Sequence, residues 1–149
     1  MGAAIKESIE ISRSPEDVFA YLDDPSRHGE WRSQIVKAEV QTDGPTRVGT
    51  KVKQTMRMGR REQDMSYEIT EHDPPRSFAF RGLDGPVRPI GHGKVEPVGD
   101  GASSRVTIEL EFEGHGFGKL LLPIVVSQAR KQVPKDQQQL KERLESGAV

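Results

Sequence analysis

Histidine is the side chain most ready to exchange protons near neutral pH, and this sequence has it only at positions 28, 72, 92 and 115. His92 is the strongest candidate, since Gly91 and Gly93 beside it would let a ligand or another backbone approach closely. Facing a cavity, it could act as a general acid or base. The favoured interpretation is that His92 faces solvent or bonds a neighbouring strand, because a one-residue shift in register reverses its face.

Other catalytic arrangements are missing from the sequence. There is no Cys, which excludes disulfides, thiolate nucleophiles and thiolate metal ligands. No Ser stands in a G-x-S-x-G elbow, so acyl-enzyme chemistry is not expected. The His residues have no i, i+4 spacing, and the glycines around His92 and His115 do not form G-x-G-x-x-G. We therefore expect no metal, no nucleotide and no other cofactor.

Polar residues interrupt several apolar stripes. Tyr67 shares the inward parity of its strand with Met65 and Ile69, so its hydroxyl could orient a ligand carbonyl or phenol; it could equally be a core aromatic with its hydroxyl at the rim. Gln54 and Gln128 also lie on apolar stripes, and a buried amide without partners costs about 1–3 kcal/mol. A wet cavity would supply those partners.

Three methionines, Met56, Met58 and Met65, lie on inward positions of adjacent expected strands. Their soft, flexible side chains suit an adaptable pocket, and they also fill ordinary gaps in a core. Both interpretations carry similar weight.

The elements that position these residues begin with a strand and two short helical segments. The segment 5–11 has mostly period-two alternation, which predicts a strand. Ser14 followed by Pro15 predicts a helix N-terminus, and Asp23-Asp24-Pro25 ends that helix. Residues 26–31 then form a second short helical piece or turn that carries the only Trp.

From Ile35 onward, five turn signals separate about six strands. Three strands alternate clearly, with one apolar and one polar face. The residues expected to face inward on them are Val52, Gln54, Met56, Met58, Met65, Tyr67, Ile69, Val106, Ile108, Leu110 and Phe112. One buried and one wet face predict an antiparallel sheet covered on a single side.

The segment 120–144 predicts one long C-terminal helix. Its expected core-facing stripe comprises Phe117, Leu121, Ile124, Val125 and Gln128. Pro123 is tolerable near the helix start, whereas Pro134 is interior and is expected to kink or break the helix.

The length indicates one domain over residues 1–149. The expected order of a strand, two short helices, about six strands and a long helix indicates an α+β fold, with the helices to one end or side of the sheet. The net charge is −1 and arginine clusters alternate with acids, so nucleic acid is not an expected partner. The longest apolar run, residues 120–126, is too short to span a membrane and contains Pro123. The first twelve residues contain no continuous apolar stretch, and we expect a cytoplasmic protein.

Several segments, in this order, match the pattern of a known family. They are Ile9 to Leu22, Trp31, Val48-Gly49-Thr50, Asp73-Pro74-Pro75-Arg76, Gly101 to Val106 and Leu140 to Glu145. Together they resemble the START-like helix-grip superfamily and, more narrowly, its polyketide cyclase/dehydrase and lipid-transport (SRPBCC) branch, over roughly residues 4 to 145. Ala102-Ser103-Ser104 stands where many relatives have Gly-Thr. We therefore expect a turn at this position whose local conformation differs from that of those relatives.

The resemblance implies a seven-stranded, curved antiparallel sheet wrapped around the C-terminal helix, with two short helices after the first strand and a hydrophobic cavity between sheet and helix. Trp31 would then lie near the cavity entrance; otherwise it is a hydrophobic plug. Members of the superfamily bind sterols, lipids, plant hormones or polyketides, cyclise aromatic polyketides, or assist chaperones, so the fold alone does not imply one chemistry.

Three functions are open. The leading hypothesis is a module that binds a small hydrophobic molecule, such as a lipid, polyketide or isoprenoid, since this needs only an apolar cavity with a few polar anchors. The alternative is a polyketide cyclase or dehydratase that uses polar cavity residues as acid and base, with no catalytic residue assigned. A protein-interaction domain would need an exposed apolar patch, against which the polar outer faces argue.

A monomer or homodimer without stable membrane insertion is expected. The side chains expected to contact the ligand are Trp31, Gln54, Met56, Met58, Met65, Tyr67, Phe78, Phe80, His92, Phe112, Leu121, Val125 and Gln128.

Overall fold

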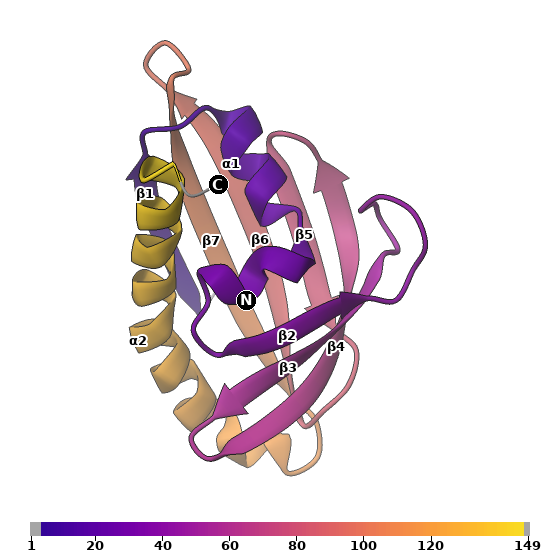
Figure 1. Cartoon of the computed structure of the whole chain (residues 1–149). Coiled ribbons are helices and arrows are strands. Elements are labelled where there is room, and N and C mark those ends of the chain that lie inside the picture. Colours follow the sequence, from indigo (N-terminus) through magenta and orange to yellow (C-terminus); the bar gives the residue numbers. More distant parts are fainter. Residues whose placement is uncertain (1–3, 148–149) are drawn as a thin grey trace.

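The computed structural model describes residues 4–147; the ends of the expected 1–149 domain, residues 1–3 and 148–149, lie outside the described residues. One antiparallel sheet, a long helix and two short helices make up this part of the chain (Figure 1). In chain order the elements are β1 (Ile5–Ile11), α1 (Pro15–Leu22), the 3-10 helix η1 (Pro25–Glu30), β2 (Ile35–Val40), β3 (Lys51–Met58), β4 (Arg61–Asp73), β5 (Ser77–Gly82), β6 (Val87–Val98), β7 (Ser103–Gly114) and α2 (Gly118–Glu145).

The sheet has seven strands in the order β1-β7-β6-β5-β4-β3-β2, and every neighbouring pair is antiparallel. After β1 the chain crosses to the far edge through α1 and η1 and then returns strand by strand to pair β7 with β1. The expected α+β helix-grip arrangement, with seven strands, two short helices and a long C-terminal helix, is confirmed.

Local capping starts both short helices: α1 begins where the sequence predicts, and η1 begins at Pro25, one residue before the expected segment 26–31. The Ser14 hydroxyl accepts a hydrogen bond from the Asp17 amide at 3.2 Å, and Pro15 occupies the first turn of α1. The carboxylate of Asp24 caps η1 by accepting from the Ser26 amide at 3.1 Å. These two starts aim α1 and η1 across the same face of the sheet that α2 covers.

The packed core lies at one end of that face. Leu140 and Leu144, near the C-terminus of α2, are fully buried together with Val18 of α1 and with Val95 and Val106 of β6 and β7. Because this core holds the C-terminal half of α2, it sets how the rest of the helix is rotated and placed over the sheet.

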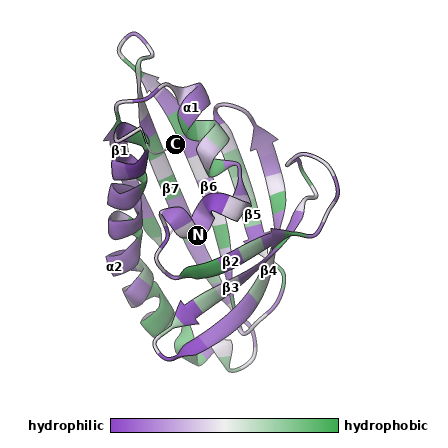
Figure 2. Ribbon diagram, viewed as in Figure 1, coloured by the Kyte–Doolittle hydropathy of each residue, from purple (hydrophilic) through white to green (hydrophobic). Residues whose placement is uncertain are grey.

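The N-terminal half of α2 is not packed into the core. Phe117 and Ile124 were expected on the core-facing stripe, and this is wrong, since they are 68% and 58% exposed. Ile124 precedes Val125 by one residue, which turns it about 100° away from the sheet around the helix axis. Figure 2 shows the result: α2 is hydrophobic near its N-terminus and hydrophilic along the rest of its length.

Helix α2 runs unbroken through Pro123 and Pro134, so of the kink or break expected at Pro134 the break does not occur, and the kink stays a prediction. Proline removes the amide that would bond the carbonyl four residues earlier, here that of Arg130. Pro134 and Arg130 are both solvent-exposed, so water can bond this carbonyl in place of the amide.

Within residues 4–147, no helix combines the length and the apolar character needed to cross a bilayer.

Candidate functional site

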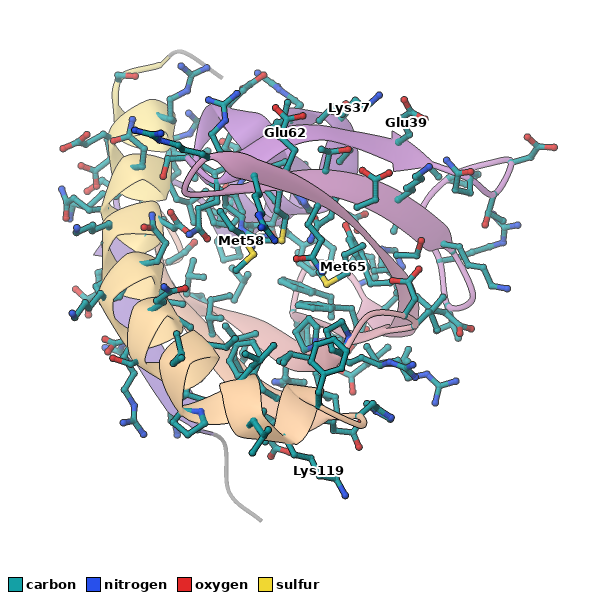
Figure 3. All side chains as sticks on the ribbon, turned by 90° about the horizontal axis from the view of Figure 1, so that it is seen from below. Lys37, Glu39, Met58, Glu62, Met65 and Lys119 are labelled. Atoms are coloured by element: carbon teal, nitrogen blue, oxygen red, sulfur yellow. The ribbon has the colours of Figure 1, made fainter. Side chains whose placement is uncertain are left out.

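A cavity of about 290 Å³ lies between the inner face of the sheet and residues 121–137 of α2. Its apolar wall comes from strands β3 to β7 and from α2. These apolar residues include Met56, Met58, Met65, Ile69, Phe78, Phe80, Val87, Ile108, Leu110, Phe112, Leu121 and Val125. Figure 3 looks into the space between sheet and helix: Met58 and Met65 point into it, whereas Lys37, Glu39 and Glu62 point away on the outer face.

Period-two alternation places these side chains. On β3 the inward residues Val52 and Gln54 are 0% and 2% exposed, and Tyr67 lies across from Val52 on β4. Thr55 departs from the pattern, because it is buried on the outer face, where its hydroxyl donates to the Asp64 carboxylate at 2.8 Å.

Two glycines of β6 leave space for two aromatic rings of β5. Phe78 is paired with Gly93 and Phe80 with Gly91, and each ring occupies the space that a Cβ on its glycine would need. The close approach that these glycines permit is therefore that of side chains from the neighbouring strand.

His92 lies on the opposite face of β6, because it alternates with Gly91 and Gly93, which face the rings. Its Nε2 atom is 3.3 Å from a carboxylate oxygen of Glu71 on the outer surface. The prediction that His92 contacts a ligand in the cavity is thus wrong, and the favoured alternative, a solvent-facing side chain, is what the structure has.

The other twelve nominated residues all border the cavity: Trp31, Gln54, Met56, Met58, Met65, Tyr67, Phe78, Phe80, Phe112, Leu121, Val125 and Gln128. Gln128 is the most open of the polar ones, being exposed on α2 beside the cavity.

Tyr67 borders this cavity, and its hydroxyl has no hydrogen-bond partner among residues 4–147. The side chain is 5% exposed and packs against Phe80, with ring centroids 5.3 Å apart. Burial raises the pKa of Tyr67 to about 12, and the nearby Arg32 guanidinium only partly opposes this shift. At neutral pH the hydroxyl is therefore protonated and able to donate a hydrogen bond.

Two further polar atoms are buried at the cavity wall. Within residues 4–147, neither the indole Nε1 of Trp31 nor the side-chain carbonyl of Gln54 has a hydrogen-bond partner. The Gln54 amide nitrogen reaches only the sulfur of Met56, at 3.6 Å. Each unpartnered group costs about 1–3 kcal/mol unless water or a ligand satisfies it. The wall thus offers hydrogen-bonding positions that the chain itself leaves open.

An ion pair that sequence reasoning missed lies at the η1 end of the cavity. Arg32 Nε is 3.9 Å from a carboxylate oxygen of Asp136 on α2, and Gln132 donates to the same carboxyl group at 2.8 Å. Burial raises the pKa of Asp136, while the hydrogen bond from Gln132 and the charge of Arg32 act in the opposite direction. Helical spacing could have found Asp136, since it follows Gln128 and Gln132 at four-residue steps.

His28 lies near Arg32 and is uncharged at neutral pH. Its Nε2–H donates to the Leu22 carbonyl at 2.8 Å, which leaves Nδ1 as an acceptor without a partner in the described chain. Burial lowers the pKa of His28 to about 4. Its ring packs edge to face against Trp31, with centroids 5.8 Å apart.

A second ionisable pair, formed by Asp23 and His72, has one of its two members at the cavity. His72 Nε2 lies 2.9 Å from the Asp23 carboxylate, and burial raises the pKa of Asp23 against the effect of this hydrogen bond. Asp23 borders the cavity, but His72 does not and packs against the Phe19 ring, with ring centroids 5.8 Å apart. The pair therefore offers one carboxyl group to a ligand.

The cavity is therefore amphipathic. Its walls toward the β3–β4 hairpin and the start of α2 are apolar, and the polar groups gather near η1. Among residues 4–147, no three His, Asp or Glu side chains are arranged to hold a metal ion. The polar groups available to a ligand are therefore hydrogen-bonding groups and the ionisable side chains of Asp23, Arg32, Tyr67 and Asp136.

Comparisons with solved structures show the same fold. A protein of Thermus thermophilus superposes with a TM-score of 0.79 at 20% identity, covering 97% of this chain and 99% of that one. A START superfamily protein from Mycobacterium smegmatis gives 0.77 at 13% identity, with 95% and 97% covered. The Zhui aromatase/cyclase of a Streptomyces species gives 0.70 at 14% identity, with 97% and 98% covered.

No curated protein sequence matches the chain. The family model that does match is described as polyketide cyclase / dehydrase and lipid transport, and the match extends over residues 2–145. The protein therefore belongs to the polyketide cyclase/dehydrase and lipid-transport family.

Proposed function

We propose that the protein binds a small hydrophobic molecule of the lipid, polyketide or isoprenoid kind in the cavity between the sheet and α2. The observation that carries this proposal is the cavity itself, whose walls are largely apolar and whose volume of about 290 Å³ is near the lower end for small-molecule sites. Burying a ligand there removes apolar surface from water on both sides, which contributes about 25 cal/mol for each Å².

The polar end of the cavity supports a ligand with one oxygen-bearing group. The Tyr67 hydroxyl and the Trp31 indole N–H can donate to a carbonyl, hydroxyl or carboxylate oxygen, and Arg32 adds a positive charge nearby. An apolar body would then face Met58 and Met65, whose flexible side chains adapt to different shapes. The ligand class is therefore an amphipathic molecule with its polar group turned toward η1.

A polyketide cyclase or dehydratase is the alternative, and one arrangement favours it. Protonated Tyr67 and the carboxyl group of Asp136 border one cavity, and both lie near the guanidinium of Arg32. Tyr67 could donate a hydrogen bond to a carbonyl oxygen while Asp136 takes a proton from the adjacent carbon. Binding remains the leading proposal because it requires no such coordinated transfer.

The first experiment is native mass spectrometry of the protein from its own source, followed by organic extraction. We expect a defined co-purifying molecule, and its structure would name the substrate class for turnover assays. In parallel, the apolar probe N-phenyl-1-naphthylamine should bind saturably at one site per chain. Non-saturating fluorescence without a bound molecule would contradict the proposal.

Turnover separates the two candidate functions. The extracted molecule, or a linear poly-β-ketone, is incubated with the protein and followed by mass spectrometry for loss of water. A carrier returns its ligand unchanged, whereas a cyclase or dehydratase converts it and loses activity on Asp136→Asn. The cytoplasmic location and the monomeric or homodimeric state expected from the sequence stay predictions.

A further inference from the structure

A group of large apolar side chains is exposed at the start of α2. Phe117, Leu120 and Ile124 are 68%, 81% and 58% exposed. Their spacing of three and four residues places them on one side of the helix. Single exposed apolar side chains are ordinary, but several on one face indicate a contact site. We call these three residues the apolar face.

The apolar face lies beside the open end of the cavity. Leu121 and Val125, the next residues along α2, border the cavity, so the helix is apolar from the cavity wall round to its outer surface. The loop before α2 is held to the β5–β6 turn, where the His115 amide donates to the Pro86 carbonyl at 2.7 Å. Across the opening, Met58 at the end of β3 is 40% exposed and points toward the helix (Figure 3).

Positive charge surrounds this end of the molecule. Residues 57–62, 83–88 and 113–120, which form the three neighbouring loops and their flanks, carry five Lys or Arg and three Asp or Glu, whereas the whole chain has a net charge of −1. One cation is paired, since Arg57 lies 3.4 Å from Glu62. Arg60, Arg61 and Lys119 are exposed, and none has an ion-pair partner within residues 4–147. Lys119 extends outward from the start of α2 in Figure 3.

The charge decides between occupants of the apolar face. A second copy of the chain would bring the same cations toward one another and lose stability by like-charge repulsion. An anionic lipid surface instead complements the cations, while the apolar side chains enter the region between headgroups and acyl chains. Both forces act at the same end of the molecule.

We propose that the apolar face and its surrounding cations dock the protein on an anionic lipid bilayer, with the open end of the cavity against the membrane. A hydrophobic ligand could then pass between bilayer and cavity without crossing water. Ligand passage rests on the proposed function, whereas docking itself does not require an occupied cavity.

The experiment is co-sedimentation of the protein with vesicles of phosphatidylcholine, prepared with and without phosphatidylglycerol. We expect binding to the anionic vesicles that weakens as salt rises. The double variant Leu120→Ser/Ile124→Ser should lower the affinity about tenfold or more by removing apolar contact with the bilayer. Arg60→Gln/Arg61→Gln should lower it about tenfold on anionic vesicles, with little effect on neutral ones.

Matched controls lie away from the cavity opening. Val48→Ser removes an equally exposed apolar side chain, 60% exposed, from the loop between β2 and β3. Lys51→Gln/Lys94→Gln removes two exposed cations from β3 and β6. Neither should change vesicle binding. Val125→Trp fills the cavity, so it should abolish binding of N-phenyl-1-naphthylamine while vesicle binding persists, which separates failure of docking from failure of the proposed function.

Three outcomes would overturn docking. In the first, the wild-type protein does not bind anionic vesicles. In the second, both double variants bind these vesicles as tightly as the wild type. In the third, light scattering shows a dimer that Leu120→Ser/Ile124→Ser dissociates, together with no vesicle binding; the apolar face would then belong to a second copy.

Discussion

The ring of Phe80 lies over Gly91, its partner on the neighbouring strand, and fills the space where a Cβ at Gly91 would stand. Phe78 and Gly93 repeat the arrangement at the next inward pair. Because a glycine has no side chain, each ring can lie close to the sheet. The two pairs therefore keep the aromatic rings low and leave the space above them open as cavity.

Gly91→Ala should push the Phe80 ring away from the sheet and into the cavity. We expect a free energy of unfolding lower by about 1–3 kcal/mol, as for overpacked cores, and weaker binding of N-phenyl-1-naphthylamine. Urea unfolding and probe titration measure the two effects. The double variant Gly91→Ala/Phe80→Leu should recover part of both losses, because the shorter side chain relieves the clash. If Gly91→Ala bound the probe with unchanged affinity, the position of the Phe80 ring would not depend on this glycine.

Tyr67→Phe should affect binding more than stability. The hydroxyl has no partner among residues 4–147, so its removal breaks no hydrogen bond within that part of the chain. For a ligand with a carbonyl or phenol group, we expect affinity to fall about three- to tenfold in calorimetry, the usual value of one hydrogen bond. A purely hydrocarbon ligand serves as the control and should bind equally well. If Tyr67→Phe bound the polar ligand as tightly as the wild type does, the Tyr67 hydroxyl would not contact the ligand.

Val125→Trp should block the cavity, because Val125 borders it from α2. N-phenyl-1-naphthylamine binding should be lost while circular dichroism stays that of a folded protein. Ile124→Trp is the matched control, since Ile124 is adjacent in sequence but 58% exposed outside the cavity. A folded Val125→Trp variant that still binds the probe would mean that the assigned cavity is not the binding site.

The buried His28 should make the stability of the fold depend on pH. Burial lowers the pKa of His28 to about 4, from an ordinary value of about 6.5, so the unfolded chain takes up a proton first as pH falls. The stability that neutral His28 contributes is complete above about pH 6.5 and is lost toward about pH 4, by up to about 3 kcal/mol.

The test for His28 is urea unfolding of the wild type and of His28→Gln across this pH range. Gln can still donate to the Leu22 carbonyl and does not titrate. The free energy of unfolding should rise with pH between 4 and 6.5 more steeply in the wild type than in the variant. Parallel pH curves would contradict a buried neutral histidine.

Much of the fold could be predicted because its signals are local. The Ser14 cap needs only the amide of Asp17 three residues later, and the alternation that turns Gln54 and Tyr67 inward needs only the pleat of a strand. Such patterns are complete within a few residues, and tertiary packing did not override them.

The polar end of the cavity could not be predicted in this way. Arg32 follows η1 and Asp136 belongs to α2, so their meeting at 3.9 Å depends on how the two helices cross the sheet. Likewise, a helical pattern shows that Ile124 and Val125 face different directions, but the rotation that turns Val125 inward comes from the packing of Leu140 and Leu144.

By itself, the sequence determined the elements, the inward parity of β3, β4 and β7, and the family, since each depends on residue types at short spacings. Only the tertiary structure decided that His92 faces Glu71 on the outer surface, that Arg32 joins Asp136, and that Phe117 and Ile124 remain exposed. These features depend on register and helix rotation, which are set by contacts between residues far apart in the chain.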